Sequence, residues 1–250
     1  MNLDFHVHGL LTKKSDFNET LLLQGIENAK EQGLDGFILC EHFNAINILS
    51  IYKYLEENYE YIGDKYIVNG FSIFMGMEVD ILGGGHVIVS GNRDAMMKIR
   101  QVLDNYMEKP NFIPFEELLD LGKEYNCLIV GSHPYRGDHP LYLQPKSLLA
   151  RLTALDLNAT DIFKKGLDET RSELEALSKE INVPYVTGSD SHYPIQLGSV
   201  RSIFNGEFST VREIINAINN REYKVKVSKA LDLKVFSAKT TKEHIKSGIV

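Results

Sequence analysis

The sequence is poor in cysteine and has no long apolar run. Its two cysteines, Cys40 and Cys127, lie far apart and form no Cys-x-x-Cys pair, so neither a disulfide framework nor a thiolate zinc site is indicated. The first residues lack the apolar segment of a signal peptide, and no stretch is long and uncharged enough for a membrane span. We therefore expect a folded cytoplasmic protein.

Basic residues are fewer than acidic ones. The chain has 27 Lys and Arg residues against 34 Asp and Glu residues, which gives a formal net charge of −7. Binding of nucleic acid through a broad basic surface needs many Lys and Arg contacts, so long nucleic acid is an unexpected partner. Two or three divalent ions in one cleft would bring about +4 to +6 and make that cleft receptive to an anion.

What the sequence does contain is a regular alternation of strand and helix patterns. An opening strand at residues 3–8 is followed by a helical spacing over 20–32 and a buried-strand run over 35–42. The alternation continues along the chain, and six or more such units are most economically closed into a barrel. We expect one α/β domain over residues 1–227, with residues 228–250 as a peripheral C-terminal extension.

Histidines and carboxylates recur where these strands end. His6 and His8 are two apart and share one strand face, and neutral imidazole nitrogens are ligands of zinc, iron or manganese. A lone His-x-His pair is explained equally well by hydrogen-bonded core histidines. The metal interpretation depends on further residues at strand ends, which meet at the mouth of a barrel. They are His42, Glu78, His133, Asp190 and His192, with His86 opening the strand after Glu78.

In their order along the chain, these motifs resemble those of the polymerase and histidinol phosphatase (PHP) domain family of metallo-phosphoesterases. The motifs are Asp4-Phe5-His6-Val7-His8, Glu41-His42, Glu78 with His86 downstream, Ser132-His133-Pro134 and Gly188-Ser189-Asp190-Ser191-His192. The resemblance covers nearly the whole chain. It implies a distorted, seven-stranded, TIM-like (β/α)7 barrel whose mouth holds two to three divalent ions, with zinc, manganese and iron all open.

The resemblance also implies three sets of ligands. The first ion is held by His6, His8, Glu78 and Asp190. The second ion is held by Glu78, His86 and His133, so that Glu78 bridges the two. The third ion takes His42, His192 and a residue of the first loop. For that residue Asp16 is our candidate, although this loop is longer than in the family's pattern.

Three further residues have expected roles beside these ligands. Glu41 stands where an aspartate is commoner in the family, and we expect it to orient a ligand. Asp4 is expected to hydrogen-bond a ligand histidine or the neighbouring backbone. His139 could donate a proton to a leaving group, but an ordinary loop histidine is the simpler interpretation.

The expected reaction is hydrolysis of a phosphate ester by a metal-bridging hydroxide. Adjacent divalent ions lower the pKa of a shared water and hold the non-bridging phosphate oxygens for in-line attack. We expect the catalytic residues to include Glu78, Asp190 and His192. Arg136 and Arg201 are placed on loops at the mouth, where they could bind the phosphate or could equally be surface arginines.

The leading hypothesis is a phosphatase for a small phosphomonoester, resembling histidinol phosphatases or phosphotyrosine phosphatases. A nucleotide phosphatase or exonuclease of the same family is an alternative. An amidohydrolase shares the His-x-His opening, but no strand-end lysine supports it here. A catalytically silent, metal-stabilised module is the non-enzymatic alternative, against which the nearly complete set of ligands argues. The ester, the metal and the oligomeric state are left open by the sequence.

Overall fold

The computed structural model describes residues 1–248, in which the strands form one 11-stranded sheet. Its order is β11-β10-β1-β2-β5-β6-β7-β8-β9, with β3 paired to β4 and β4 to β5. The strands are β1 (Asn2–Val7), β2 (Gly36–His42), β3 (Glu60–Ile62), β4 (Lys65–Val68), β5 (Phe71–Asp80), β6 (His86–Ser90), β7 (Leu128–Ser132), β8 (Ala154–Asn158), β9 (Tyr185–Gly188), β10 (Val200–Phe204) and β11 (Tyr223–Val227).

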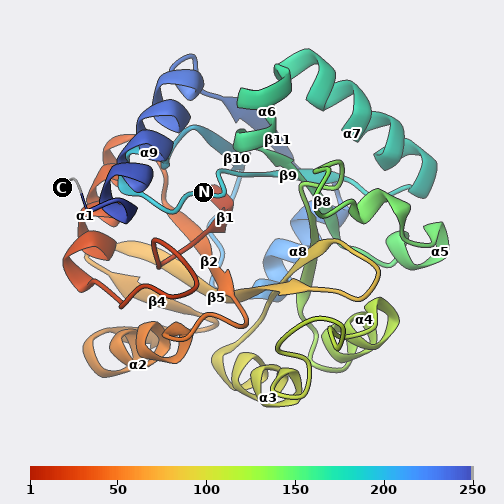
Figure 1. The fold of residues 1–250 in the computed structure, drawn as a ribbon, viewed down its shortest axis with the longest axis horizontal. Coiled ribbons are helices and arrows are strands. Elements are labelled where there is room, and N and C mark those ends of the chain that lie inside the picture. The colour runs from red at the N-terminus through yellow and green to blue at the C-terminus, as the bar shows by residue number, and fades with distance from the viewer. Residues whose placement is uncertain (249–250) are drawn as a thin grey trace.

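The sheet closes on itself where the segment after β9 returns to β1. The amide of His8 donates to the carbonyl of Ser191 at 2.9 Å, and the amide of Asp190 donates to the carbonyl of His6 at 2.8 Å. The closed ring therefore consists of β1, β2 and β5 to β9, which confirms the predicted seven-stranded barrel. Figure 1 shows this ring of strands with helices around its outside.

The distortion of the barrel lies at β6. This strand is antiparallel to both β5 and β7, whereas the strands of an undistorted barrel are all parallel. Because β6 runs the opposite way, its first residue meets the last residues of its neighbours: His86 pairs with Asp80 on one side and with Ser132 on the other. A histidine that opens a strand thus lies at the same rim as residues that end strands.

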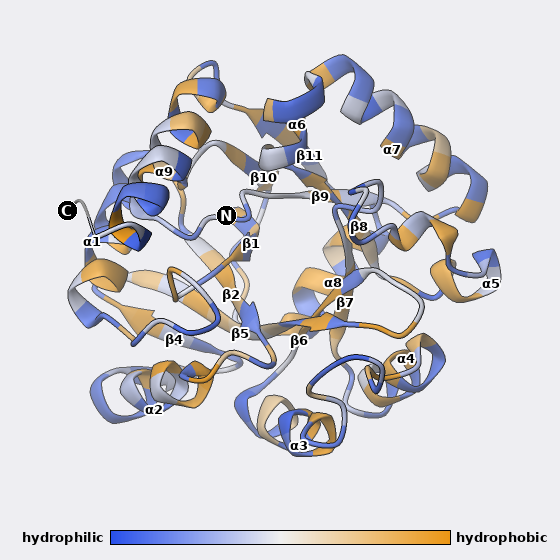
Figure 2. Cartoon of the chain, in the orientation of Figure 1, coloured by the Kyte–Doolittle hydropathy of each residue, from blue (hydrophilic) through white to orange (hydrophobic). Residues whose placement is uncertain are grey.

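Most helices cover the outside of the barrel, and Figure 2 shows hydrophobic and hydrophilic residues alternating around them, as expected for helices with one face on the barrel wall. The helices are α1 (Glu19–Glu31), α2 (Ile48–Asn58), α3 (Arg93–Leu103), α4 (Phe115–Glu124), α5 (Lys146–Leu149), α6 (Ala159–Lys165), α7 (Leu167–Ile181), α8 (Val211–Asn219) and α9 (Leu231–Lys246), with 3₁₀ turns η1 (Leu141–Leu143) and η2 (Pro194–Gln196).

The apolar core is divided by the barrel wall into two clusters. The larger cluster lies between the strands and the outer helices. The smaller one fills the barrel interior, where strand residues such as Phe5, Ile38 and Phe74 are grouped with Ile214 and Ile218 of α8. Helix α8 therefore closes one end of the barrel, behind the ring of strands in Figure 1, and leaves the other end as the mouth.

The predicted elements agree closely with the structure where apolar patterns are strong. The strand expected at 3–8, the helix at 20–32 and the strand at 35–42 agree with β1, α1 and β2 to within one residue at each end. The hairpin β3–β4 and the helix α6 were not predicted. In the expected extension 228–250, residues 231–246 form α9, which packs on η2 and α6, and residues 249–250 lie outside the described part of the chain. Within residues 1–248, no helix is both long and apolar enough to cross a membrane.

Candidate metal centre

The first two histidines reach the mouth through an irregularity in β1. Phe5 lies in the barrel-interior cluster, so strict alternation would turn His6 away from the interior. The pairing register of β1 with β2 shifts between Asp4 and Val7, and a bulge of this kind re-aims the side chains that follow it. As a result, His6 and His8 both face the mouth, each with its ring buried.

Two other members of the site are aimed by an unusual backbone conformation. His133 directly follows β7 and has φ 29°, and Asp190 follows β9 with φ 57°. Side chains other than glycine rarely adopt this left-handed region, and each such residue costs about 1–3 kcal/mol. Residues held in this way are concentrated at active sites and ligand sites, where surrounding contacts compensate for the strain.

Glu78, at the end of β5, lies at the centre of the histidines. Its Oε1 is 3.0 Å from His86 Nδ1, 3.1 Å from His133 Nε2 and 3.4 Å from His6 Nε2, and its Oε2 is 3.1 Å from His42 Nδ1. Burial by itself raises the pKa of this carboxyl, but the imidazoles, His86 and His6 first, hold the pKa well below its usual range. Glu78 is therefore ionised and offers one oxygen to each side of the cluster.

Asp190 faces the cluster from the opposite wall. Its Oδ1 lies 3.3 Å from His8 Nε2 and 3.6 Å from His6 Nε2, and its Oδ2 pairs with Arg136 Nη1 at 2.9 Å. Burial raises the pKa of Asp190, while Arg136 and His6 reverse this and keep the pKa well below its usual range. The Nε2 atoms of His6 and His8 are 3.1 Å apart. Their donor atoms and those of the carboxylates therefore converge on one centre.

These separations fit ligands of a shared ion. Donors that lie 2.0–2.1 Å from a tetrahedral zinc ion are about 3.4 Å apart. The contacts of His6 and His8 with Glu78 and Asp190 range from 3.3 to 3.6 Å. Three sets of residues at the mouth have donor atoms within 4.8 Å of one another: His6, His8 and Asp190; His6, Glu78 and His133; and His8, His42 and His192.

The histidines differ in their affinity for protons. Burial lowers the pKa of His42 and His192 well below the usual value and that of His133 to about 3, so all three are neutral, the form that binds metals. Burial also acts on His86, but there Glu78 and other nearby carboxylates prevail and raise the pKa to about 9. The pKa values of His6 and His8 are raised as well, because nearby acidic groups outweigh the lowering effect of burial. Divalent ions would compete with protons at these three positions.

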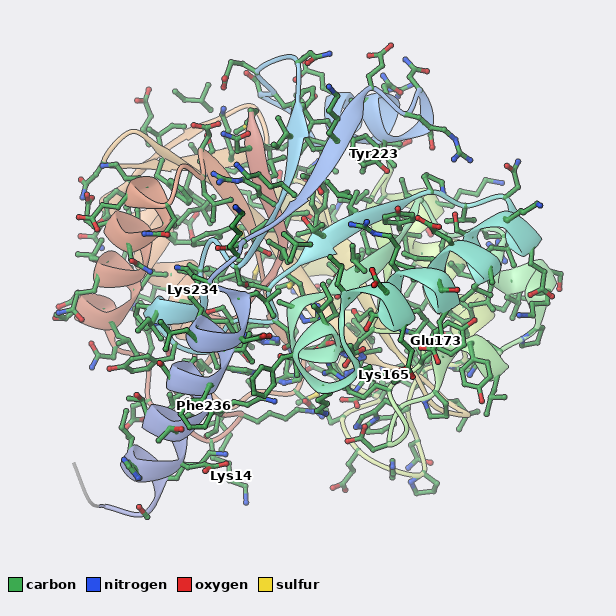
Figure 3. The ribbon with its side chains drawn as sticks, turned by 90° about the horizontal axis from the view of Figure 1, so that it is seen from above. Lys14, Lys165, Glu173, Tyr223, Lys234 and Phe236 are labelled. Atoms are coloured by element: carbon green, nitrogen blue, oxygen red, sulfur yellow. The ribbon has the colours of Figure 1, made fainter. Side chains whose placement is uncertain are left out.

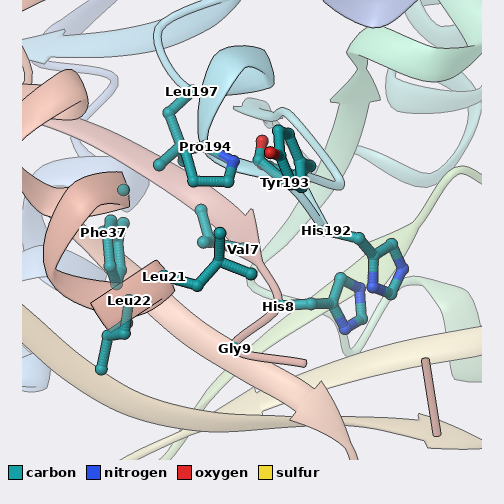
Figure 4. Close-up of a pocket in the computed structure, with 12 residues that line it drawn as sticks. Val7, His8, Gly9, Leu21, Leu22, Phe37, His192, Tyr193, Pro194 and Leu197 are labelled. Carbon is teal, nitrogen blue, oxygen red and sulfur yellow. The ribbon is translucent and has the colours of Figure 1, made fainter. Parts of the chain in front are cut away.

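An apolar pocket of about 30 Å³ lies beside the cluster and is lined by residues of β1, β2, α1 and the segment after β9. Figure 4 shows Phe37 and Leu197 on its apolar side and the rings of His8 and His192 together at its other end. These two rings are stacked, with centroids 4.0 Å apart and planes at 10°. Packing thus helps to fix the direction of both imidazoles.

Asp156 belongs to the site, although the sequence did not single it out. It lies in β8, and its Oδ2 accepts hydrogen bonds from His6 Nδ1 at 3.0 Å and Asn158 Nδ2 at 2.9 Å. A carboxylate behind a metal-binding histidine fixes the tautomer and orientation of the ring. The polar residues Asp156 and Asn158, alternating with leucines at the end of a weak strand pattern, are the signal that could have revealed it.

Glu41 and Asp4 make the contacts expected of orienting residues. Glu41 Oε1 lies 3.4 Å from His8 Nδ1, and its Oε2 accepts hydrogen bonds from the amides of Gly9 and Leu10 at 3.1 and 2.8 Å. Asp4 Oδ1 accepts from the backbone amides of Ser189 and His6 at 2.9 and 3.1 Å. Both acids therefore fix the local backbone around the first histidine pair.

At the outer rim, His139 forms a fourth donor set with Asp80 and His86. The rings of His139 and His86 have centroids 4.0 Å apart, and His86 Nε2 lies 2.9 Å from Asp80 Oδ1. The other carboxylate oxygen of Asp80 pairs with Lys13 Nζ at 2.9 Å. The loop histidine is thus part of the rim.

Two predicted site residues lie outside the cluster. Asp16 is exposed in the long loop before α1, where its Oδ1 accepts a hydrogen bond from Asn47 Nδ2 at 3.3 Å. The third donor beside His42 and His192, which was expected to be Asp16, is His8. Arg201 donates to the carbonyl of Gln32 at 2.7 Å, beyond the end of α1. Its strand, β10, runs antiparallel to β1 and carries the side chain away from the mouth.

Arg136 lies at the mouth, but its guanidinium is already engaged. It donates from Nε to Asp161 Oδ1 at 3.1 Å, from Nη2 to Asn158 Oδ1 at 3.0 Å and pairs through Nη1 with Asp190. The geometry makes it a support for Asp190.

The cluster lines a cavity of about 190 Å³ whose wall also includes Lys239 and Lys242 of α9. Burial lowers the pKa of Lys242 to about 8. Figure 3 shows Lys234 at the start of this helix, where its Nζ donates to the carbonyl of Leu197 at 2.9 Å. The lysines of α9 are the functional candidates that the sequence pattern missed.

Comparisons with known proteins agree with this geometry. The sequence profile of a family described as PHP-associated matches residues 172–223. No curated protein sequence matches the chain significantly. The crystal structure of PsfC from Pseudomonas syringae PB-5123 has a TM-score of 0.80 at 19% identity, covering 98% of both chains.

Two endonuclease structures share the fold. The lesion-specific endonuclease PfuEndoQ from Pyrococcus furiosus has a TM-score of 0.65 at 22% identity, over 90% of this chain and 57% of that one. Endonuclease Q in complex with a 27-mer duplex carrying an abasic lesion has a TM-score of 0.64 at 20% identity, over 90% and 58%. The chain thus spans little more than half the length of these endonucleases.

The second of these structures corrects one expectation. We expected long nucleic acid to be an unlikely class of partner because the chain is acidic, but a protein of the same fold holds a DNA duplex at its active site. Net charge is a poor guide here because a ligand meets the charge of its own site, and bound ions can make that local charge opposite to that of the whole chain. The acidic composition therefore excludes no class of phosphate ester.

Independent observations agree on the relationship. Five motifs occur in the family's order, and the seven-stranded barrel brings their histidines and acids to one mouth. The PHP-associated profile matches the segment that includes β9 and the Asp190 motif. The chain therefore resembles the PHP-domain family in the order of its motifs, and a PHP-associated family profile matches residues 172–223.

Proposed function

We propose that this protein is a metal-dependent hydrolase of phosphate esters that acts on a small phosphomonoester. The observation that carries the proposal is the convergence of imidazoles with two ionised carboxylates, Glu78 and Asp190, at the mouth. Neutral nitrogen donors and carboxylate oxygens suit two to three ions of zinc, manganese or iron. The catalytically silent alternative gains no support from a site in which so many donors are in place.

The residues of the chain hold this chemistry in position. Bound divalent ions supply an activated water and neutralise the non-bridging oxygens of a phosphate. Glu78 offers its two oxygens to different histidines, which is the arrangement of a bridging ligand. Arg136 keeps Asp190 ionised and directed at His8, and Asp156 orients His6.

The size of the cavity favours a small ester. Its volume of about 190 Å³ lies below the range of roughly 300–1,000 Å³ that is usual for pockets of drug-sized ligands. A phosphoryl group with a short leaving group fits such a space beside the ions. Histidinol phosphate and phosphotyrosine are suitable representatives of this class.

A second candidate is a phosphodiesterase that acts on nucleic acid. The shared fold with endonuclease Q, which has been captured with a DNA duplex, favours it. The same residues would hold the ions for both candidates, and these ions would supply the same chemistry at phosphorus. The two candidates differ in what the walls around the mouth accept.

The test is a substrate panel with each metal restored to the chelated protein. We expect zinc, manganese or iron to restore release of phosphate from p-nitrophenyl phosphate, histidinol phosphate or phosphotyrosine. Cleavage confined to bis(p-nitrophenyl) phosphate or to a labelled duplex, with or without an abasic site, would support the second candidate. Failure of every metal to restore hydrolysis of any ester would refute both.

A further inference from the structure

The face of α9 toward the mouth carries two lysines without an acidic partner. Lys239 and Lys242 are three residues apart, about one helical turn, and both line the cavity of the metal centre. Within residues 1–248, neither ammonium group lies within 4.0 Å of a carboxylate oxygen or donates a hydrogen bond. An ammonium group drawn partly out of water is costly unless a ligand supplies negative charge.

The other cationic groups of this cavity are already paired, His86 with Glu78 and Asp80. The guanidinium of Arg136 is bonded to Asp161, Asn158 and Asp190. Lys239 and Lys242 are therefore the positive groups of the cavity wall that are free to bind an incoming anion, among the residues that the structure describes.

Contacts of α9 hold the two lysines over the mouth. Lys234 Nζ donates to the carbonyls of Leu197 at 2.9 Å and Ile195 at 3.4 Å, which ties the first turn of the helix to the segment after the Asp190 motif (Figure 3). Ala238 of the same helix is buried and lines the cavity. Lys239 Nζ also lies 5.0 Å from the ring centroid of Phe163 in α6. A charge held in place in this way loses little entropy when it binds a ligand.

We propose that Lys239 and Lys242 bind phosphate oxygens in the cavity that they share with the metal ligands and select phosphomonoester dianions over phosphodiester monoanions. The inference rests on the proposed function and adds the substrate class. Near neutral pH a monoester carries up to one more negative charge than a diester, because its second pKa is about 6. Two ammonium groups on a half-buried wall favour the dianion, and the second ester group of a diester would displace an oxygen from them.

The test compares a double variant with a matched control. Lys239→Met with Lys242→Met removes both charges and keeps apolar stems of similar length. Lys246→Met removes the same charge from an exposed position on the same helix. The substrates are p-nitrophenyl phosphate as the monoester and bis(p-nitrophenyl) phosphate as the diester, with inorganic phosphate as a competitive inhibitor.

We expect the double variant to lose about 100-fold in kcat/KM on the monoester, with the larger part in KM, since each lost lysine removes a charge-assisted hydrogen bond to the phosphate oxygens. The inhibition constant of phosphate should rise by about tenfold or more for the same reason. Turnover of the diester should change little, and the Lys246→Met control should match the parent protein throughout. An equal loss on both esters, or no loss, would overturn the inference.

A second measurement needs no turnover. The metal-loaded protein is acetylated with and without inorganic phosphate, and each lysine is followed by peptide mass spectrometry. Phosphate should protect Lys239 and Lys242 but leave Lys246 reactive. Equal reactivity with and without phosphate would contradict the inference even if the protein hydrolyses esters. A protein that protects both lysines but hydrolyses no ester would instead contradict the proposed function.

Discussion

At the scale of single residues, the site depends on histidines whose two ring nitrogens have different partners. His6 presents Nε2 to the shared centre while its Nδ1 binds Asp156, and His8 presents Nε2 while its Nδ1 faces Glu41. This division fixes which nitrogen is free to bind an ion. The acids behind the rings are therefore as necessary to the site as the rings themselves.

Replacing Asp156 by alanine tests this division. The ring of His6 would lose the partner that fixes its tautomer, so we expect the affinity for zinc to fall about 10- to 100-fold. Competition with a chromophoric chelator measures the change. Asp168→Ala, at an exposed position in the first turn of α7, is the control and should bind zinc like the parent protein. Equal zinc affinity in both variants would show that Asp156 has no part in binding.

Replacing His8 by alanine tests the site directly. His8 belongs to two of the donor sets, so its loss weakens more than one position for an ion. We expect phosphoester hydrolysis to fall below detection while circular dichroism shows a folded protein. His244→Ala, which changes an exposed histidine of α9, should leave hydrolysis unchanged. Normal turnover by the His8 variant would remove the proposed mechanism.

At the scale of elements, the close approach of β9 to its neighbours determines the geometry of the mouth. A methyl group added at Gly188 would collide with the Cβ of His6 and lie 2.6 Å from Asp156 Oδ1. Gly188→Ala should therefore lower the free energy of unfolding by about 1–3 kcal/mol and weaken zinc binding, because the strands must shift. Urea denaturation and a zinc titration measure the two effects. Gly206→Ala, where a methyl group meets nothing within 4 Å, should change neither.

The same scale explains what the sequence could predict. β5 and β2 are buried along their length, so their apolar runs are strong, and the acid or histidine at each end is conspicuous. Parallel strands then bring these ends to one rim. The sequence pattern could not show the bulge in β1, because a register shift depends on the neighbouring strand.

The residues whose positions the sequence did not reveal are placed by loops or by contacts between distant segments. Arg201 follows the Asp190 motif closely in sequence, but β10 turns back along β1 and takes it to the far end. Asp16 depended on the path of a loop, which no periodicity fixes. Lys239 and Lys242 lie in a helix whose position is set by a contact of Lys234 with Leu197, and that contact leaves no local signal.

At the scale of the whole molecule, the chain places many interacting imidazoles and carboxylates at one end of the barrel. Ions that bind the folded form alone stabilise it by mass action, by about 2.7 kcal/mol at 100 times the dissociation constant. We expect chelation to lower the midpoint of thermal unfolding and added zinc to restore it, with a rise that follows the logarithm of the zinc concentration once this exceeds the dissociation constant. An unchanged midpoint would mean that the mouth binds no ion. The His8→Ala variant should show a reduced response.

The pH dependence of stability follows from the opposite pKa shifts of the histidines. His42, His133 and His192 have lowered pKa values, so below about pH 6.5 only the unfolded chain takes up their protons and stability falls as pH falls. His86, with its pKa raised to about 9, stabilises the fold when protonated, and this contribution is lost as pH rises from about 6.5 through 9. The unfolding free energy of the metal-free protein should therefore peak near pH 6.5.

Zinc, which displaces the protons, should remove the decline in stability at alkaline pH. Urea unfolding across this pH range, with and without zinc, measures both effects. A metal-free protein that becomes steadily more stable up to about pH 9 would contradict the assignment of charges in the mouth.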